Sequence, residues 1–209
     1  MVLPPRLAVA SRNPHKLREI GRICADWPVE WVTDQDDAGD WPDVEETGAT
    51  YLDNALLKAR AVAAALDLPA LADDSGIEVD ALGGAPGPRS ARYAGEGATD
   101  AANLQELIRA MKGIPGGGRT ARYRCVVVLA LPGGSEVHAE GTCEGTLLGT
   151  ARGSGGFGYD PIFRPAGWDV TMAELTDDQK DRISHRGRAL RALAEVVDAR
   201  VSPPADPPV

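Results

Sequence analysis

Hydrophobic positions recur along this chain with the periods of both strands and helices. Arg6 to Ala10 is a short apolar run, and a polar turn leads from it into a helix predicted from about His15 to Ala25. Val29 to Thr33 indicates a second strand. Tyr51 to Leu66 has apolar residues at helical spacing, which predicts a longer helix. Strands therefore alternate with helices in this part of the chain, which favours an α/β fold.

The middle of the chain predicts a short strand, a loop-rich section and a helix. Pro69 to Ala72 indicates a short buried strand that ends at Asp73 and Asp74. Gly76 to Gly97 is rich in loop-forming residues. Thr99 is a candidate N-cap for a helix whose apolar face precedes a stop at Gly113.

The last part of the chain predicts a hairpin, a glycine-rich loop and a closing helix. Arg122 to Leu131 and Glu136 to Leu148 are joined by a Pro-Gly-Gly turn, which predicts an antiparallel pair. A loop at Gly153 to Gly158 precedes a short strand at Ile162-Phe163, and a helix follows from about Ser184 to Asp198. The predicted fold class is thus α/β, with a mixed, elongated central sheet flanked by helices and an active site in a cleft.

Length and composition predict one globular domain. The chain has 209 residues, of which 43% are hydrophobic, and this is enough for a sizeable core. We expect residues 1–201 to form a single domain. The proline-rich end, 202–209, fits neither a helix nor a ladder, and we expect it to be disordered.

Several classes of protein are excluded by composition. No run of about 20 apolar residues indicates a membrane span, and the N-terminal segment is too quickly polar for a signal peptide, so we expect a cytoplasmic protein that does not bind membranes. Cys24, Cys125 and Cys143 are too far apart for a zinc site. A net charge of -9 argues against binding to nucleic acid.

Two acidic segments are candidates for metal chemistry. Asp73, Asp74 and Ser75 follow a predicted strand, where open α/β sheets often bind ligands, and adjacent carboxylates suit a hard divalent cation and a base that takes a proton from water. An ordinary Asp-Ser-Gly turn explains the segment equally well. Glu45 and Glu46 form a second carboxylate pair, for which a solvated loop before a helix is the simpler interpretation.

Basic residues occupy three places that suit an anion. The segment from Ser11 to Lys16 opens a helix, so its backbone N–H groups and Lys16 are candidates for phosphate binding, although a polar turn is an equal alternative. Lys58 shares a helix face with Asn54, which a solvated face also explains. Arg186 stands in the first turn of the last helix against the helix dipole, with Lys180 upstream, and a bound anion would relieve that conflict, although a solvated helix start is an equal alternative.

Two further patterns are rejected as cofactor sites. Gly153 to Gly158 fits G-x-G-x-x-G, but a strand-like run follows it where a dinucleotide site needs a helix. His138 and Glu140 have the spacing that begins a zinc deaminase site, but no P-C-x-x-C follows.

Taken together, the chain resembles the inosine triphosphate pyrophosphatase family from about Leu7 to Leu193. Several motifs occur in that family's order, and each is weak alone while their combination is specific. The motifs are Ser11-Arg-Asn-Pro-His-Lys16, Glu45-Glu-Thr-Gly48 with Asn54-Ala-Leu-Leu-Lys58, Ala72-Asp-Asp-Ser-Gly76, Gly83-Gly-Ala-Pro-Gly87 with Ser90-Ala-Arg-Tyr93, Gly156-Phe-Gly-Tyr-Asp-Pro161 and Ser184-His-Arg-Gly187.

The resemblance implies hydrolysis of dITP, ITP and XTP to the monophosphate and pyrophosphate. It implies Mg²⁺ held by Glu45 and Asp74, with Asp74 also the proton acceptor, and Asp73 and Glu46 in support. It further implies a homodimer. The substrate-binding residues that it implies are Ser11, Arg12, Asn13, Pro14, His15, Lys16, Lys58, Ser75, Phe157, Gly158, Tyr159, Asp160, Lys180, His185 and Arg186.

Two other functions use much of the same set of residues. A purine-nucleotide sensor would bind the phosphates and the base without hydrolysis, whereas only an enzyme needs Glu45 and Asp74 together. A related pyrophosphatase acting on modified pyrimidine triphosphates would differ in its preference for dITP over dUTP.

Overall fold

The computed structural model describes residues 3–36 and 40–201, which form a six-stranded mixed sheet. The strand order is β2-β1-β3-β4-β5-β6, with β1 parallel to both of its neighbours and the remaining pairs antiparallel. The predicted α/β class with a mixed sheet is therefore confirmed. The tail 202–209, predicted to be disordered, lies outside the described residues.

The N-terminal elements follow the predicted order. Strand β1 (Arg6–Val9) leads into α1 (Pro14–Ile23), and β2 (Glu30–Val32) returns beside β1. Helix α1 begins with proline at its first position, where the missing N–H costs nothing. Helix α2 (Tyr51–Leu66) begins at a capping box formed by Thr50 and Asp53.

Strand β3 is much longer than predicted. It extends over Ala70–Val79 and carries Asp73 and Asp74 within it, so the prediction that the strand ends at these two residues is wrong. The reason is its partner, because β4 (Thr120–Ala130) pairs with β3 along the whole length from Ala70 to Val79. Tertiary pairing thus continues the strand through polar residues that local propensity would assign to a turn.

The rest of the chain builds the other end of the sheet. Strand β5 (Glu136–Leu147) forms the predicted hairpin with β4, and the short β6 (Phe163–Pro165) lies beside β5. Helix α3 (Asp100–Ala110) has the predicted Thr99 cap. The sequence missed α4 (Asp177–Ile183), which directly precedes α5 (His185–Val201). Four short 3-10 turns complete this part: Asp80–Leu82, Gly87–Arg92, Gly116–Gly118 and Met172–Glu174.

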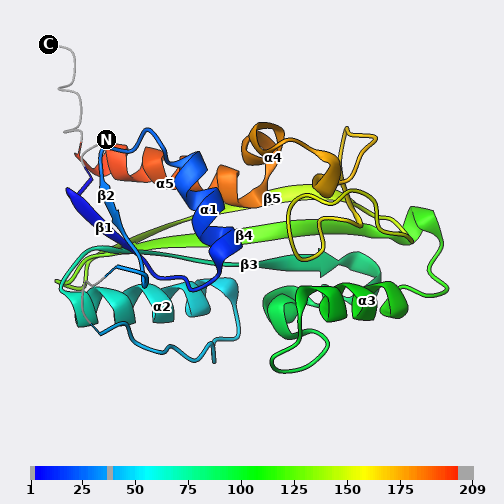
Figure 1. Cartoon of the computed structure of the whole chain (residues 1–209), viewed down its shortest axis with the longest axis horizontal. Helices are drawn as coiled ribbons and strands as arrows, with labels where there is room; N and C mark the ends of the chain where they lie inside the picture. Colours follow the sequence, from blue (N-terminus) through cyan, green and yellow to red (C-terminus); the bar gives the residue numbers. More distant parts are fainter. Residues whose placement is uncertain (1–2, 37–39, 202–209) are drawn as a thin grey trace, which may run out of the picture.

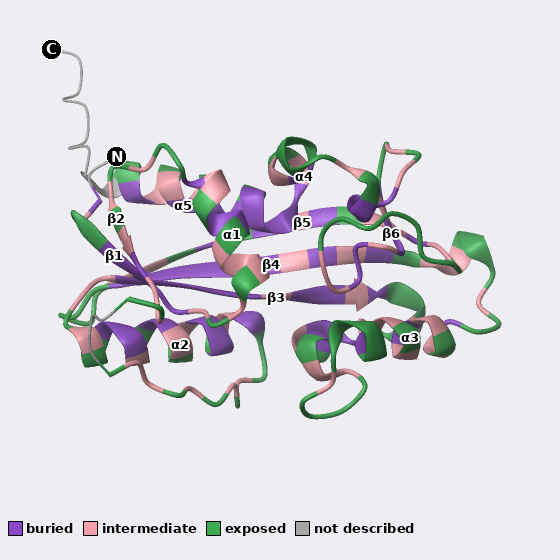
Figure 2. Ribbon diagram, in the orientation of Figure 1, coloured by how far each residue is buried: buried purple, intermediate pink, exposed green. Residues whose placement is uncertain are grey.

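Helices cover both faces of the sheet (Figure 1). Helices α1 and α5 lie on one face and α2 and α3 on the other, and the buried positions follow the strands between them (Figure 2). Leu190 and Leu193 of α5 pack against the first face together with Leu71, while Ala55 and Ala59 of α2 pack against the second. No described helix is both long and apolar enough to cross a membrane.

Helix α5 approaches the sheet closely at Gly141 of β5. A Cβ atom there would collide with the main-chain oxygen of His185 and the main-chain nitrogen of Ala189. Only glycine therefore lets the start of α5 lie this close to the sheet, and this contact sets where His185 and Arg186 enter the interior.

Candidate active site

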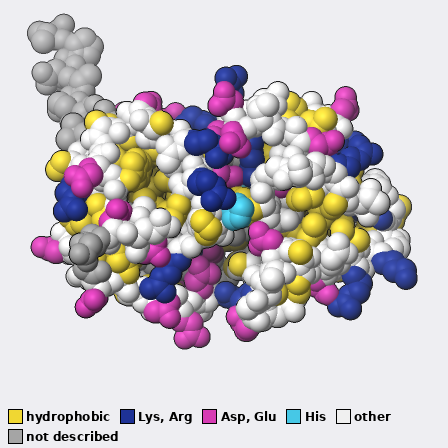
Figure 3. Space-filling view, in the orientation of Figure 1, with side chains coloured by type: hydrophobic (Ala, Val, Ile, Leu, Met, Phe, Trp, Pro, Cys, Tyr) yellow, Lys and Arg dark blue, Asp and Glu magenta, His cyan; other side chains and the backbone are white. Residues whose placement is uncertain are grey.

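A cleft of about 340 Å³ opens where β3 continues beyond the end of β1. Strand β1 pairs with β3 only as far as Leu71, so the edge of β3 near Asp74 and Ser75 is not covered by β1. This volume lies in the range of small-molecule sites. Acidic and basic side chains gather around the middle of the face seen in Figure 3.

Most of the predicted site residues meet in this cleft. Pro14, His15, Glu45 and Asp73 are the predicted residues that do not line it. The predicted residues that line it are Ser11, Arg12, Asn13, Lys16, Glu46, Lys58, Asp74, Ser75, Phe157, Gly158, Tyr159, Asp160, Lys180, His185 and Arg186.

Asp73 and Asp74 point to opposite faces of β3, because successive side chains of a strand alternate. Asp74 faces α2, where its carboxylate accepts a hydrogen bond from Asn54 Nδ2 at 3.2 Å and lies 3.3 Å from Lys58 Nζ. Asp73 faces α1 and α5 and forms ion pairs with Lys16 at 3.2 Å and Arg186 at 2.9 Å. The two adjacent carboxylates therefore do not share one ligand.

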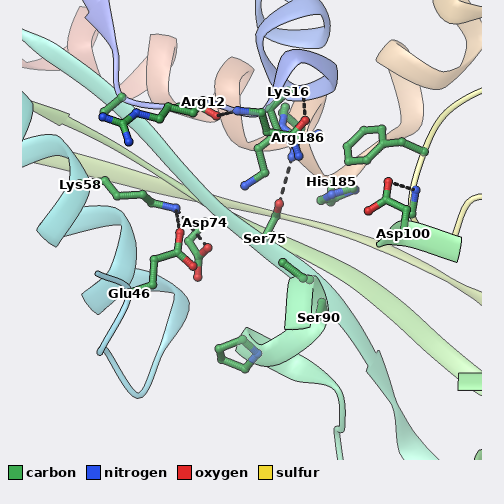
Figure 4. A pocket seen from close by; sticks show the side chains of 18 of the residues that line it. Arg12, Lys16, Glu46, Lys58, Asp74, Ser75, Ser90, Asp100, His185 and Arg186 are labelled. Carbon is green, nitrogen blue, oxygen red and sulfur yellow. Dashed lines mark hydrogen bonds and ion pairs between the residues drawn. The ribbon is translucent and has the colours of Figure 1, made fainter. Parts of the chain in front are cut away.

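Lys58 joins the carboxylates at one end of the cleft (Figure 4). Its ammonium group donates to Glu46 at 2.7 Å and to the main-chain oxygen of Asp73 at 2.7 Å. Burial alone would lower the pKa of Lys58, but Asp74 and Glu46 raise it, so the group stays charged. Burial raises the pKa of Asp74 above its ordinary value, although Lys58 and Lys16 oppose this.

The two glutamates of the Glu45-Glu46 pair differ in their surroundings. Glu46 lines the cleft and is held by Lys58 and, at 3.6 Å, by Arg92. Glu45 is exposed, and within the described part of the chain its side chain has no ion-pair partner. The Glu46 carboxylate is therefore already ion-paired, whereas the Glu45 carboxylate is unpaired within the described residues but does not line the cleft.

The start of α1 is closed by its own cap. The N–H groups of His15 and Lys16 both donate to the Asn13 side chain, at 2.9 and 3.3 Å. The backbone donors that the sequence assigned to a phosphate are thus already used in this structure. Charge remains available from Lys16 and from Arg12, whose guanidinium forms an exposed ion pair with Asp43 at 2.9 Å.

An ion-pair network lies beneath the cleft, and its centre is the fully buried Arg186. The Nε–H of Arg186 donates to Asp73, one terminal nitrogen donates to Asp73 and Ser75, and the other donates to Glu19. Lys180 lies 2.6 Å from Glu19 and 2.5 Å from Asp160. Arg186 and Lys180 are therefore held by protein carboxylates, and one N–H of the second terminal nitrogen of Arg186 has no hydrogen-bond partner among the described residues.

Glu19 is a site residue that the sequence analysis missed. It is 4% exposed on α1, and it is the carboxylate that links Arg186 to Lys180. Burial raises the pKa of Glu19, but Arg186 and Lys180 outweigh this and hold it at about 2. An acidic residue next to the apolar Ile20, on the side of the helix that faces the core, was the available signal.

Aromatic rings form the other end of the cleft. The Phe157 ring stacks on His15 with centroids 5.0 Å apart, and Lys180 Nζ lies 4.9 Å from its centre. Tyr123 stacks on His185 at 4.5 Å. The Tyr159 hydroxyl donates to the main-chain oxygen of Ser90 at 2.8 Å. Flat rings and cations together suit an electron-rich aromatic ligand.

Burial and Arg186 lower the pKa of His185 well below its ordinary value, so this imidazole is neutral at physiological pH. Its Nδ1 is buried and has no hydrogen-bond partner among the described residues. Burial raises the pKa of Asp160 despite Lys180, and this carboxylate accepts a hydrogen bond from the Tyr123 hydroxyl at 3.1 Å. Tyr123, Asp100 and Ser90 also line the cleft but were not predicted as site residues, because the local patterns around them indicate only a strand, a helix and a loop.

The carboxylates of the cleft suit a divalent cation that is also held by phosphate oxygens of a bound ligand. Within the described residues no group of three or more His, Cys, Asp or Glu side chains is arranged around one metal position. Asp74 and Glu46 already share a cation, the ammonium of Lys58. Magnesium in phosphate-handling sites is commonly held by one or two carboxylates together with phosphate oxygens, and this cleft supplies that number.

Comparison with known proteins identifies relatives over almost the whole chain. The model of the Ham1 family matches residues 7–196. A protein named "dITP/XTP pyrophosphatase" from Syntrophobacter fumaroxidans is 52% identical over 192 residues, which cover 92% of this chain and 82% of the relative.

Solved structures show the same fold. A HAM1 protein from Coxiella burnetii has a TM-score of 0.83 and 39% sequence identity, and the match covers 94% of this chain and 100% of that one. A "Nucleoside-triphosphatase / dITP/XTP pyrophosphatase" from Mycobacterium abscessus has a TM-score of 0.73 and 46% identity, with 90% of this chain and 98% of that chain covered.

Proposed function

The chain belongs to the Ham1 family, and from this premise we propose that it hydrolyses the non-standard purine nucleotides dITP, ITP and XTP to the monophosphate and pyrophosphate. Such an activity removes these nucleotides from the nucleotide pool. The observation that carries the proposal is the division of one cleft into a charged end around Asp74 and Lys58 and an aromatic end around Phe157. A purine triphosphate has the same division, with a charged tail and a flat base.

Asp74 acts as the proton acceptor in this reaction. Water attacks the α-phosphorus, the bond from this phosphorus to the oxygen that bridges to the β-phosphate breaks, pyrophosphate leaves, and the proton of the water passes to Asp74. The pKa of Asp74, raised by burial, makes the carboxylate a stronger base than an exposed aspartate. Asn54 and Lys58 fix its two oxygens, so its position is set before the substrate arrives.

Lysine and arginine side chains hold the phosphates. Lys58 pairs with Asp74 on one face of β3, and Lys16 pairs with Asp73 on the other. Arg12 also lines the cleft. Charge on the departing pyrophosphate grows as the bond breaks, so fixed cations stabilise the transition state more than the ground state.

Magnesium is the proposed cofactor, and when bound it neutralises phosphate oxygens that the lysines do not reach. Asp74 would hold it together with a carboxylate of the Glu45-Glu46 pair. Glu45 is the proposed ligand because it is uncommitted, whereas Glu46 is neutralised by Lys58. Substitution of each glutamate by glutamine separates the two: loss of Glu45 raises the Mg²⁺ concentration needed for half-maximal activity, and an effect confined to Glu46 would reassign the ligand.

Base selection follows from the donors that remain. The free N–H of Arg186 suits the 6-oxo group of hypoxanthine or xanthine, whereas the 6-amino group of adenine would bring two donors together. An unpaired buried donor costs about 1–3 kcal/mol, so a few such contacts give about 10²-fold discrimination against dATP.

A substrate panel tests the proposal. Pyrophosphate release is measured with dITP, XTP, dGTP, dATP and dUTP, each with and without Mg²⁺. We expect Mg²⁺-dependent release from dITP and XTP far above that from the standard nucleotides. Preference for dUTP would indicate a pyrimidine enzyme, and tight binding of dITP without turnover would indicate a sensor; either result overturns the proposal.

Two further properties belong to the same proposal. The resemblance favours a homodimer, which sedimentation at equilibrium tests, and a cytoplasmic location, which fractionation of the source cells tests. A monomeric mass at all concentrations, or recovery in another compartment, would overturn the respective proposal.

A further inference from the structure

The loop that carries Phe157 is tied to α3 by a residue that no motif includes. Asp100, the first residue of α3, accepts a hydrogen bond from the main-chain N–H of Gly158 at 3.0 Å. The two residues are 58 positions apart in sequence. Figure 4 shows Asp100 on the aromatic side of the cleft, opposite Lys58 and Asp74.

Both N–H groups next to the stacking ring are held by carboxylates. Asp160 accepts the N–H of Phe157 at 2.8 Å, and Asp100 accepts the N–H of Gly158. Gly156 and Gly158 have φ values of 67° and 59°, a conformation that glycine adopts without strain. Because glycine leaves this loop conformationally free, the two carboxylates hold the main chain from which the ring projects.

The anchor itself is firmly placed. Thr99 caps α3 by accepting the N–H of Ala102 at 3.2 Å, and Leu107 on the same helix is fully buried. Asn103, 2% exposed, accepts the N–H of Ala94 at 2.8 Å and so fixes the chain before the helix. Asp100 therefore presents its oxygen from a fixed position.

Asp160 and Asp100 differ in what they do besides holding the loop. Asp160 is buried, forms an ion pair with Lys180 and accepts a hydrogen bond from Tyr123, so its loss would disturb the whole ion-pair network. Asp100 is exposed, lines the cleft, and has no ion-pair partner in the described chain. Among the described residues, the bond to Gly158 is the one hydrogen bond that its side chain makes, so its substitution acts on the position of the loop.

We propose that Asp100 is a positioning residue that holds the Phe157 loop in place for the purine base through the Gly158 N–H. The inference rests on the proposed function for the identity of the base. It assigns to α3 a part in substrate affinity, through the distance between the Phe157 ring and the opposite wall of the cleft. The carboxylate does not take part in bond breaking.

The test compares Asp100→Ala with Asp100→Asn, which keeps an oxygen acceptor for Gly158. For Asp100→Ala we expect KM for dITP to rise roughly tenfold with kcat within about twofold, and for Asp100→Asn a KM within about threefold of the parent. The matched control is Asp177→Ala, because Asp177 is likewise the first residue of a helix behind a threonine cap and lies outside the cleft.

Binding of dIMP and of pyrophosphate, measured by calorimetry on the same proteins, separates positioning from a general structural effect. Weaker dIMP binding with unchanged pyrophosphate binding supports the inference, and equal loss of both, or a large fall in melting temperature, overturns it. If Asp100→Ala does not fold, Asp100→Leu takes its place. If the parent protein binds dIMP in this pattern but hydrolyses no triphosphate, the proposed function fails while the role of Asp100 stands; unchanged dIMP affinity in Asp100→Ala overturns that role.

Discussion

Asp74 is the residue on which the proposed chemistry depends, and Lys58 controls its ionisation. Burial raises the pKa of Asp74, and the nearby ammonium of Lys58, 3.3 Å away, limits that rise. A general base works only when deprotonated, so activity falls as pH drops through the pKa of Asp74. The acid limb of the pH–rate profile therefore reports this residue.

Replacement of Lys58 by methionine removes the opposing charge. We expect the pKa of Asp74 to rise further, so the acid limb of kcat/KM moves to higher pH. Lys58→Arg keeps the charge and should return the limb toward that of the parent. The measurement is kcat/KM for dITP from acidic to neutral pH; an acid limb that stays in place in Lys58→Met would show that another group titrates there.

The ion pairs of Glu19 should make the free energy of unfolding depend on pH in a defined range. The pKa of Glu19 is held at about 2, below the usual value of 4.5, so its ionised form stabilises the fold above pH 4.5 and this contribution is lost as pH falls toward 2. Glu19→Gln leaves Arg186 and Lys180 without this carboxylate and should cost about 3 kcal/mol at neutral pH. Denaturant unfolding at several pH values checks this: the difference from the parent should shrink below pH 4.5, and a constant difference would contradict the ion-pair explanation.

At the scale of elements, the site depends on how far strands and helices continue. Local pattern predicted α2 at its observed bounds, because apolar spacing is a local feature. It could not predict that β3 continues to Val79, since that depends on pairing with β4, and so it did not place Asp73 and Asp74 on opposite faces.

The contact of α5 with β5 is the element-scale feature that most directly positions the site. A side chain at Gly141 would press on the main chain of His185 and Ala189, so Gly141→Ala should destabilise the fold by about 2 kcal/mol and lower kcat/KM for dITP. Gly133→Ala is the matched control, because a Cβ atom there meets nothing within 4 Å. Thermal melting and steady-state kinetics provide the test; equal behaviour of the two variants would show that α5 is free to shift.

For the molecule as a whole, the cleft joins two ends that bind different parts of one substrate. Lys58 serves the charged end and Phe157 the aromatic end, and no contact joins the two side chains in the described structure. Phe157→Leu should weaken dIMP binding roughly tenfold and leave pyrophosphate binding unchanged, because base stacking contributes about 1–3 kcal/mol. Lys58→Met should weaken pyrophosphate binding and leave dIMP binding unchanged. Calorimetry on both variants with both products would reveal any coupling between the two ends of the cleft.

The overall class and most of the site were predictable for different reasons. Alternating strands, helices and one hairpin indicated the mixed sheet, and the combination of short motifs assembled the residues of the cleft from Ser11 to Arg186. Residues that act through long-range contacts were missed. Glu19 and Asp100 acquire their roles only when α1 meets α5 and when α3 meets the Phe157 loop. The position of Glu19 beside Ile20 indicates burial but not its partners, and no local pattern indicates the partner of Asp100.

The most direct test of the account is the position of bond cleavage. Hydrolysis of dITP with Mg²⁺ in ¹⁸O-labelled water, followed by mass spectrometry of the products, shows which phosphorus the water attacks. We predict one ¹⁸O atom in dIMP, unlabelled pyrophosphate, and loss of both products with Asp74→Asn. Label in pyrophosphate, release of inorganic phosphate with dIDP, or undiminished turnover by Asp74→Asn would contradict attack on the α-phosphorus assisted by Asp74.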